Sequence, residues 1–126
     1  MPDVNFHKAK LDEILDAYSE HLFIQGICLF YIGVHAIDYI LAYKFNIKDI
    51  PTHRGRKKKI LELFDEKTAE YFSQLLTYSL AIRYNEISSE EIVYKMKKSL
   101  QNLVEHLNEN YNFPPDLKKK IIEKNS

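Results

Sequence analysis

A histidine and an aspartate lie within one long apolar stretch of the sequence, close enough to act together. Tyr31, His35 and Asp38 follow the spacing i, i+4, i+7, so on a helix they share one face. An imidazole and a carboxylate in an apolar helix need hydrogen-bond partners, because an unpaired buried polar group is costly. Two interpretations stay open: a satisfied polar cluster that orients the loop after this helix, or a site in a cleft or a dimer interface.

A second candidate site is the basic run after Pro51, which His53 leads. Its cations, two arginines and three lysines, are Arg54, Arg56, Lys57, Lys58 and Lys59. Cations at the start of a helix oppose its dipole, so they do not serve helix stability there. The run suits phosphate binding. The alternative is a solvated basic face balanced by Glu62, Asp65 and Glu66.

The third candidate is Arg83 with Tyr84, at the end of another periodic apolar segment. An arginine near a helix C-terminus interacts favourably with the helix dipole, and that alone would explain its position. Arg83 is therefore interpreted first as structural.

The sequence lacks the motifs of other common nucleotide-binding and metal-binding sites. Glycine occurs only at positions 26, 33 and 55, which excludes a P-loop and a dinucleotide fingerprint. No two of the five histidines lie four residues apart, and the single cysteine, Cys28, excludes a zinc-finger set. We therefore expect no metal and no tightly bound cofactor.

The elements that position these residues are predicted to be helices. Apolar residues repeat with helical spacing near residues 11–22, 60–64, 69–82 and 93–107, and residues 22–45 are apolar on most sides. Gly26 and Gly33 share a face of that central helix, where we expect close approach of a neighbouring helix. Asp65 is predicted to cap the fourth helix, and Ser88, with Glu91, to cap the fifth.

These elements predict an all-α, up-and-down bundle of four to five helices. We expect one domain over residues 1–126, with the basic tail 114–126 peripheral and a short helix over about residues 116–124 of it. Eighteen basic and eighteen acidic residues give zero net charge, so any attraction to polyanions must be local. His35 and Asp38 argue against a membrane span over residues 22–43, and the one cysteine suits a reducing cytoplasm.

Three segments together resemble the HEPN domain, in its small stand-alone prokaryotic form. They are Phe30 to Asp38 on the long helix, the Pro51-Thr52-His53 loop with Arg56, and Tyr78 to Tyr84. The resemblance implies a helical bundle that is frequently dimeric. It also implies links to nucleotidyltransferases and to RNA-directed defence or toxin–antitoxin systems.

HEPN ribonucleases often pair an arginine with a histidine that follows after four to six residues. Here no histidine follows Arg54, Arg56 or Arg83 at that spacing. We therefore expect a non-catalytic module, a homodimer that engages RNA weakly, a nucleotide or a nucleotidyltransferase partner. The alternative is a divergent ribonuclease in which His35 or His53 acts with Arg83. Proximity of these groups in an open cleft would favour the enzyme.

Overall fold

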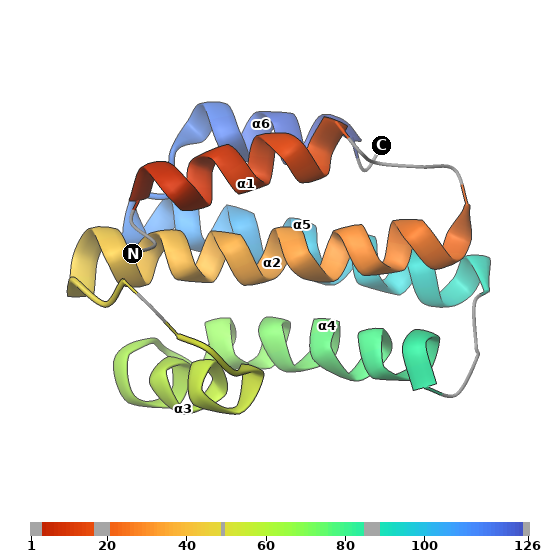
Figure 1. The fold of residues 1–126 in the computed structure, drawn as a ribbon, viewed down its shortest axis with the longest axis horizontal. Coiled ribbons are helices and arrows are strands. Elements are labelled where there is room, and N and C mark those ends of the chain that lie inside the picture. Colours follow the sequence, from red (N-terminus) through yellow and green to blue (C-terminus); the bar gives the residue numbers. More distant parts are fainter. Residues whose placement is uncertain (1–3, 17–20, 49, 85–88, 125–126) are drawn as a thin grey trace.

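The computed structural model describes residues 4–16, 21–48, 50–84 and 89–124, and these form six helices with no strand. In chain order the helices are α1 (Val4–Asp16), α2 (Leu22–Phe45), α3 (His53–Leu63), α4 (Glu66–Tyr84), α5 (Glu90–Tyr111) and α6 (Pro115–Lys124). Figure 1 shows α1, α2, α4 and α5 running side by side along the long axis, with the short α3 below α4. The predicted all-α bundle is confirmed at this level.

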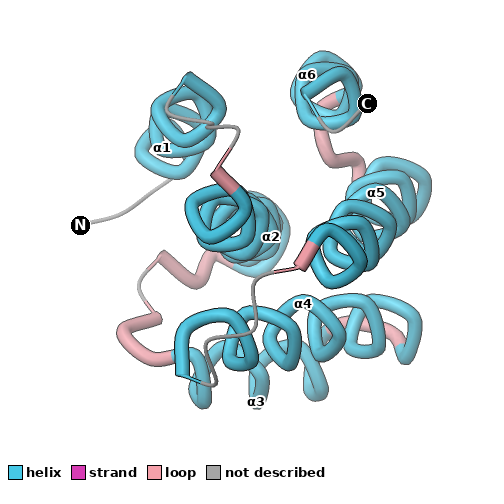
Figure 2. The backbone as a smooth tube through the Cα atoms, turned by 90° about the vertical axis from the view of Figure 1, so that its right-hand side faces the viewer, coloured by secondary structure: helices cyan, strands magenta, loops and turns pink. Residues whose placement is uncertain are grey.

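Helix α2 is the centre of the bundle, as its apolar sequence predicts. Viewed end-on, it lies between α1, α4 and α5 (Figure 2). It is long and apolar enough to cross a membrane, but 67% of its most apolar window is buried inside the bundle. That burial is typical of the core helix of a bundle, so it favours this interpretation over a membrane span.

Gly26 and Gly33 let α4 approach α2 closely, which confirms the contact expected from their spacing. A Cβ atom at Gly33 would lie 2.8 Å from Leu75 Cδ1, and one at Gly26 would collide with Ile82. Both neighbouring side chains are buried and belong to α4. The absence of a side chain on α2 therefore sets the distance between the two helices.

Side-chain caps fix where the later helices begin. The predicted cap Asp65 is confirmed, since its Oδ1 accepts a hydrogen bond from the backbone N–H of Thr68. Thr52 caps α3 in the same way by accepting from the N–H of Gly55. The residue that caps α5 is Ser89, whose Oγ accepts from the N–H of Ile92, whereas the expected Ser88 lies outside the described residues.

The C-terminal segment differs from the expectation of a peripheral tail. It forms α6, whose Leu117 and Ile121 are fully buried together with Phe113 in the preceding turn. Asn112 adopts a left-handed conformation that ends α5 and reverses the chain. The short helix expected here is thus confirmed, but it is part of the bundle, because its two apolar residues cover the core.

Candidate functional site

A buried ion pair joins α2 to α3. Arg56 Nε donates to Asp38 Oδ1 at 2.7 Å, and Arg56 Nη2 donates to Asp38 Oδ2 at 2.8 Å. Arg56 Nη2 also donates to the carbonyl oxygen of Ile50 at 3.2 Å. Only 7% of Asp38 and 5% of Arg56 is exposed. The two-pronged geometry matches the fork of the guanidinium to the carboxylate and fixes the loop between the helices.

His53 lies beside this ion pair in a defined protonation state. Arg56 Nη1 and His53 Nδ1 are 3.0 Å apart. A guanidinium can only donate, so His53 Nδ1 accepts, and the proton of the neutral ring is on Nε2. Burial of the ring, followed by the charges of Arg56 and Arg83, lowers the pKa of His53. At pH 7 His53 therefore offers an N–H donor rather than a base.

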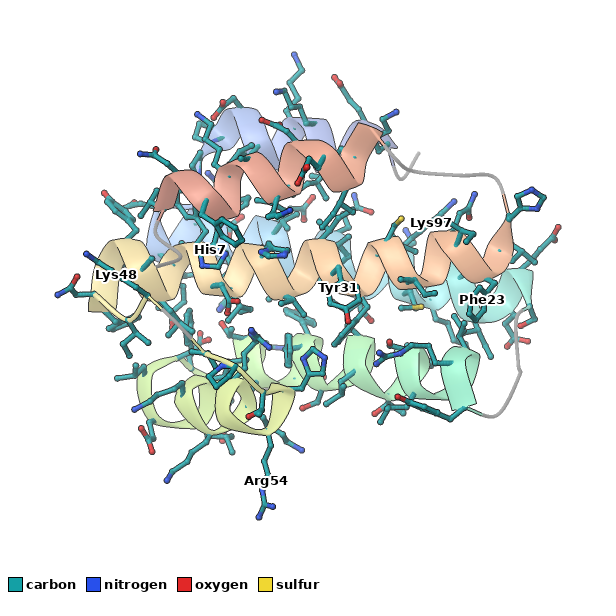
Figure 3. All side chains as sticks on the ribbon, viewed as in Figure 1. His7, Phe23, Tyr31, Lys48, Arg54 and Lys97 are labelled. Atoms are coloured by element: carbon teal, nitrogen blue, oxygen red, sulfur yellow. The ribbon has the colours of Figure 1, made fainter. Side chains whose placement is uncertain are left out.

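A second histidine pair joins α1 to α2. The Nδ1 atoms of His7 and His35 are 3.0 Å apart, so one ring donates to the other. Burial, and then the neighbouring His7, lowers the pKa of His35 to about 4, although Asp38 opposes this. His35 is therefore neutral at pH 7. Figure 3 shows His7 on α1 directed towards α2.

These groups line one cavity of about 330 Å³ between α1, α2 and the start of α3. Its polar lining consists of His7, Tyr31, His35, Asp38, Lys48, His53 and Arg56. The predicted members Tyr31, His35, Asp38 and His53 thus lie together. His7 was not among the predicted residues, because it is 28 positions from His35 and no local spacing links the two.

The basic run divides between the interior and the solvent. Arg56 faces inward to Asp38, whereas Arg54, Lys57 and Lys58 are exposed. Figure 3 shows Arg54 pointing away from the body of the protein. Lys59 lies 3.5 Å from Glu62 in a solvent-exposed pair, as the balanced-face interpretation anticipates. We call the exposed part, Arg54, Lys57 and Lys58, the outer α3 face.

Asp65 was also expected to balance the charge of the basic run. Instead it caps α4, and its Oδ2 lies 2.7 Å from His106 Nε2. Burial alone would raise the pKa of the Asp65 carboxyl, but hydrogen bonds from Thr68 and His106 outweigh it and lower the pKa. Asp65 therefore belongs to the cap and does not balance the outer α3 face.

Arg83 is held by aromatic rings. Its guanidinium carbon is 5.3 Å from the ring centre of Phe30 and 5.5 Å from that of Tyr84. The Nε atom is buried and has no hydrogen-bond partner among the described residues. Within the same residues no carboxylate forms an ion pair with Arg83, so its charge is not neutralised by a neighbour there.

His53 and Arg83 meet at Phe30. The His53 ring lies 5.0 Å from the ring of Phe30 and 6.2 Å from that of Tyr31, between ring centres. The charge of Arg83 contributes to the lowered pKa of His53, which also indicates proximity. We call Tyr31, His53, Arg83 and Tyr84 the His53–Arg83 surface. His35 and Asp38 belong to the adjoining cavity, with His7 and Arg56 as their partners.

Comparison of the chain with protein-family models, with curated proteins and with solved structures found no match.

Proposed function

We propose that this chain is a HEPN-type binding module that holds a phosphate group of RNA or of a nucleotide on the His53–Arg83 surface. The observation that carries the proposal is Arg83. Its guanidinium is oriented by Phe30 and Tyr84, and no carboxylate among the described residues pairs with it. A guanidinium presents paired N–H donors that match two phosphate oxygens.

The neighbours of Arg83 suit the rest of such a ligand. Tyr84 is 72% exposed, so its ring offers a face on which a base can stack. The Nε2–H of His53 can donate to a phosphate or ribose oxygen. Asp38 is the carboxylate of the adjoining cavity, and its charge is compensated by Arg56, so it does not repel an anion.

The tautomer of His53, with its proton on Nε2, argues for binding rather than catalysis. A general base for the ribose 2′-hydroxyl needs an unprotonated ring nitrogen that faces the substrate. In His53 the unprotonated Nδ1 accepts from Arg56, and the remaining nitrogen carries the proton. His53 in this arrangement can position a ligand but cannot accept its proton.

Fluorescence anisotropy with a labelled single-stranded RNA tests the proposal. We expect Arg83→Gln to weaken binding about tenfold or more, the effect of removing a charge-assisted hydrogen bond. The matched control is Arg54→Gln, which removes an exposed arginine of the outer α3 face. The slope of log affinity against log salt should fall by roughly 0.7 for each phosphate that the variant no longer neutralises.

Equal affinity of Arg83→Gln and wild type would overturn the proposal. Loss of binding in Arg54→Gln alone would move the phosphate site to the outer α3 face. Circular dichroism of each variant checks that the bundle is intact.

The second candidate function is a divergent ribonuclease, and the contact of His53 and Arg83 with the same Phe30 ring favours it. Arg83 would stabilise the phosphate and His53 would exchange a proton after a change of tautomer. Cleavage of RNA by the pure protein, lost in His53→Ala, would replace the binding module by the enzyme. His35 is a weaker choice, because its Nδ1 is engaged by His7.

We also propose that the module is a homodimer. Exposed apolar side chains occur at the N-terminus of α2, the C-terminal part of α4 and the N-terminus of α5: Phe23, Ile24, Leu80 and Tyr94. These helix termini lie at one end of the bundle (Figure 1). An exposed apolar patch is a common protein contact surface. A nucleotidyltransferase, which the resemblance implies as a partner, would be sought by co-purification with the chain.

A further inference from the structure

The sequence led us to expect no metal, but the fold brings together residues that no local spacing links, and we infer that His7, His35 and Asp38 form a binding site for a transition-metal ion whose donor set fits Zn²⁺. One ligand atom from each residue lies within 4.8 Å of the others. Two imidazole nitrogens and a carboxylate oxygen are a common set in zinc sites that keep one coordination position open. The inference is independent of the proposed phosphate site, which depends on Arg83, a residue that does not line the cavity beside the three ligands.

The two histidines are already close to the required separation. Zn–N bonds of about 2.05 Å in a tetrahedron place two nitrogens roughly 3.3 Å apart. The Nδ1 atoms of His7 and His35 are 3.0 Å apart, so the rings must separate by only a few tenths of an ångström. The ion would replace the proton that now joins the two rings.

Asp38 keeps the capacity to bind an ion while it is paired with Arg56. A carboxylate has about four acceptor positions, and the hydrogen bonds from Arg56 Nε and Nη2 use one on each oxygen. Arg56 would then act as an outer partner that orients the carboxylate, as groups hydrogen-bonded to metal ligands usually do. A movement of at most about 1.5 Å by the carboxylate or an imidazole brings the ligand atoms to tetrahedral spacing, because no two of them are more than 4.8 Å apart.

The surroundings of the three groups suit a bound ion. His7 and Asp38 are buried and His35 is half-buried, so an ion held by the three would be largely shielded from solvent. The cavity of about 330 Å³ adjoins all three residues, so it has room for a water molecule or a ligand at the open position. The ion would also join α1 to α2 near the start of α1, where His7 and His35 now make the contact.

Calorimetric titration of chelator-treated protein with Zn²⁺ at pH 7 tests the inference. We expect one ion for each chain and a rise in melting temperature, because the ion binds only the folded arrangement. His7→Gln and His35→Gln should each lower the affinity by about a hundredfold or more. His21→Gln, which removes an exposed histidine outside the cluster, should leave the affinity unchanged.

X-ray absorption of the zinc-loaded wild-type protein needs no variant and covers the case in which a substitution disturbs α1. We expect two imidazole ligands, with zinc–nitrogen distances of about 2.0–2.1 Å. No binding at millimolar zinc, an affinity that neither His7→Gln nor His35→Gln changes, or a spectrum with fewer than two imidazoles would overturn the site. Arg83→Gln should bind zinc as wild type does, so failure of the phosphate proposal would leave this result standing.

Discussion

Replacing Asp38 with alanine leaves the guanidinium of Arg56 in the interior without its carboxylate. Arg56 is 5% exposed, and both prongs of its fork bind Asp38 at 2.7 and 2.8 Å. Breaking a buried pair from one side typically costs about 3–5 kcal/mol, because the remaining charge stays desolvated. A domain of this size is stable by only about 5–15 kcal/mol, so Asp38→Ala should remove a large part of the free energy of unfolding.

Urea denaturation followed by circular dichroism measures this loss. The matched control is Glu13→Ala, which breaks the exposed pair between Lys10 and Glu13, 2.8 Å apart. Exposed pairs contribute less than about 1 kcal/mol, so the control should hardly move the urea midpoint.

A double variant separates the charge from the contact. Asp38→Leu with Arg56→Met removes both ions and fills similar volume, so it should be clearly more stable than Asp38→Ala. Two results would contradict this reasoning: Asp38→Ala loses no more stability than Glu13→Ala, or the double variant is no more stable than Asp38→Ala. Either result would mean that the unpaired charge of Arg56 is not the main cost of the substitution.

Three further predictions concern the bundle. In metal-free buffer the free energy of unfolding should fall by on the order of 2–3 kcal/mol as the pH drops from about 6.5 to 4. The reason is that His35 takes up its proton at a higher pH in the unfolded chain than in the folded one. Urea titrations at several pH values measure this fall. His35→Gln should flatten it, and an equal slope in that variant would contradict the assignment. Gly33→Ala should destabilise by about 1–3 kcal/mol despite its better helix propensity, since the new methyl group would lie 2.8 Å from Leu75 Cδ1; a raised melting temperature would show that Leu75 moves aside freely. Light scattering should find a dimer that Phe23→Glu dissociates, whereas Leu61→Glu, at an exposed leucine on α3, should leave it intact. A wild-type monomer at tens of micromolar would contradict self-association.

The helices could be predicted from the sequence because their causes are local. Apolar residues at helical spacing define each buried face, and a residue such as Asp65 caps a helix through atoms three positions away. The contact of Gly26 and Gly33 with α4 could also be expected, because glycine in a helix interior costs about 1 kcal/mol relative to alanine, and the close approach of another helix compensates for this cost. The tail helix was also predicted nearly at its observed bounds. Its peripheral position was wrong, because a pattern as short as Leu117 and Ile121 does not reveal that both side chains are buried.

The tertiary structure determined which polar residues contact each other. Arg54 and Arg56 are alike in the sequence, but two residues turn a helix by about 200°, so one faces solvent and the other faces Asp38. The position of α3, which packs against α4 and is joined to α2 by this ion pair, determines which arginine is buried.

The same holds for the two histidine contacts of the site. His7 reaches His35 across 28 positions because α1 folds back along α2. His53 and Arg83 approach each other because Phe30 lies between α3 and α4. Residue spacing in the sequence identifies neighbours only within one helix. A site assembled from four helices is therefore fixed by the packing of their apolar faces.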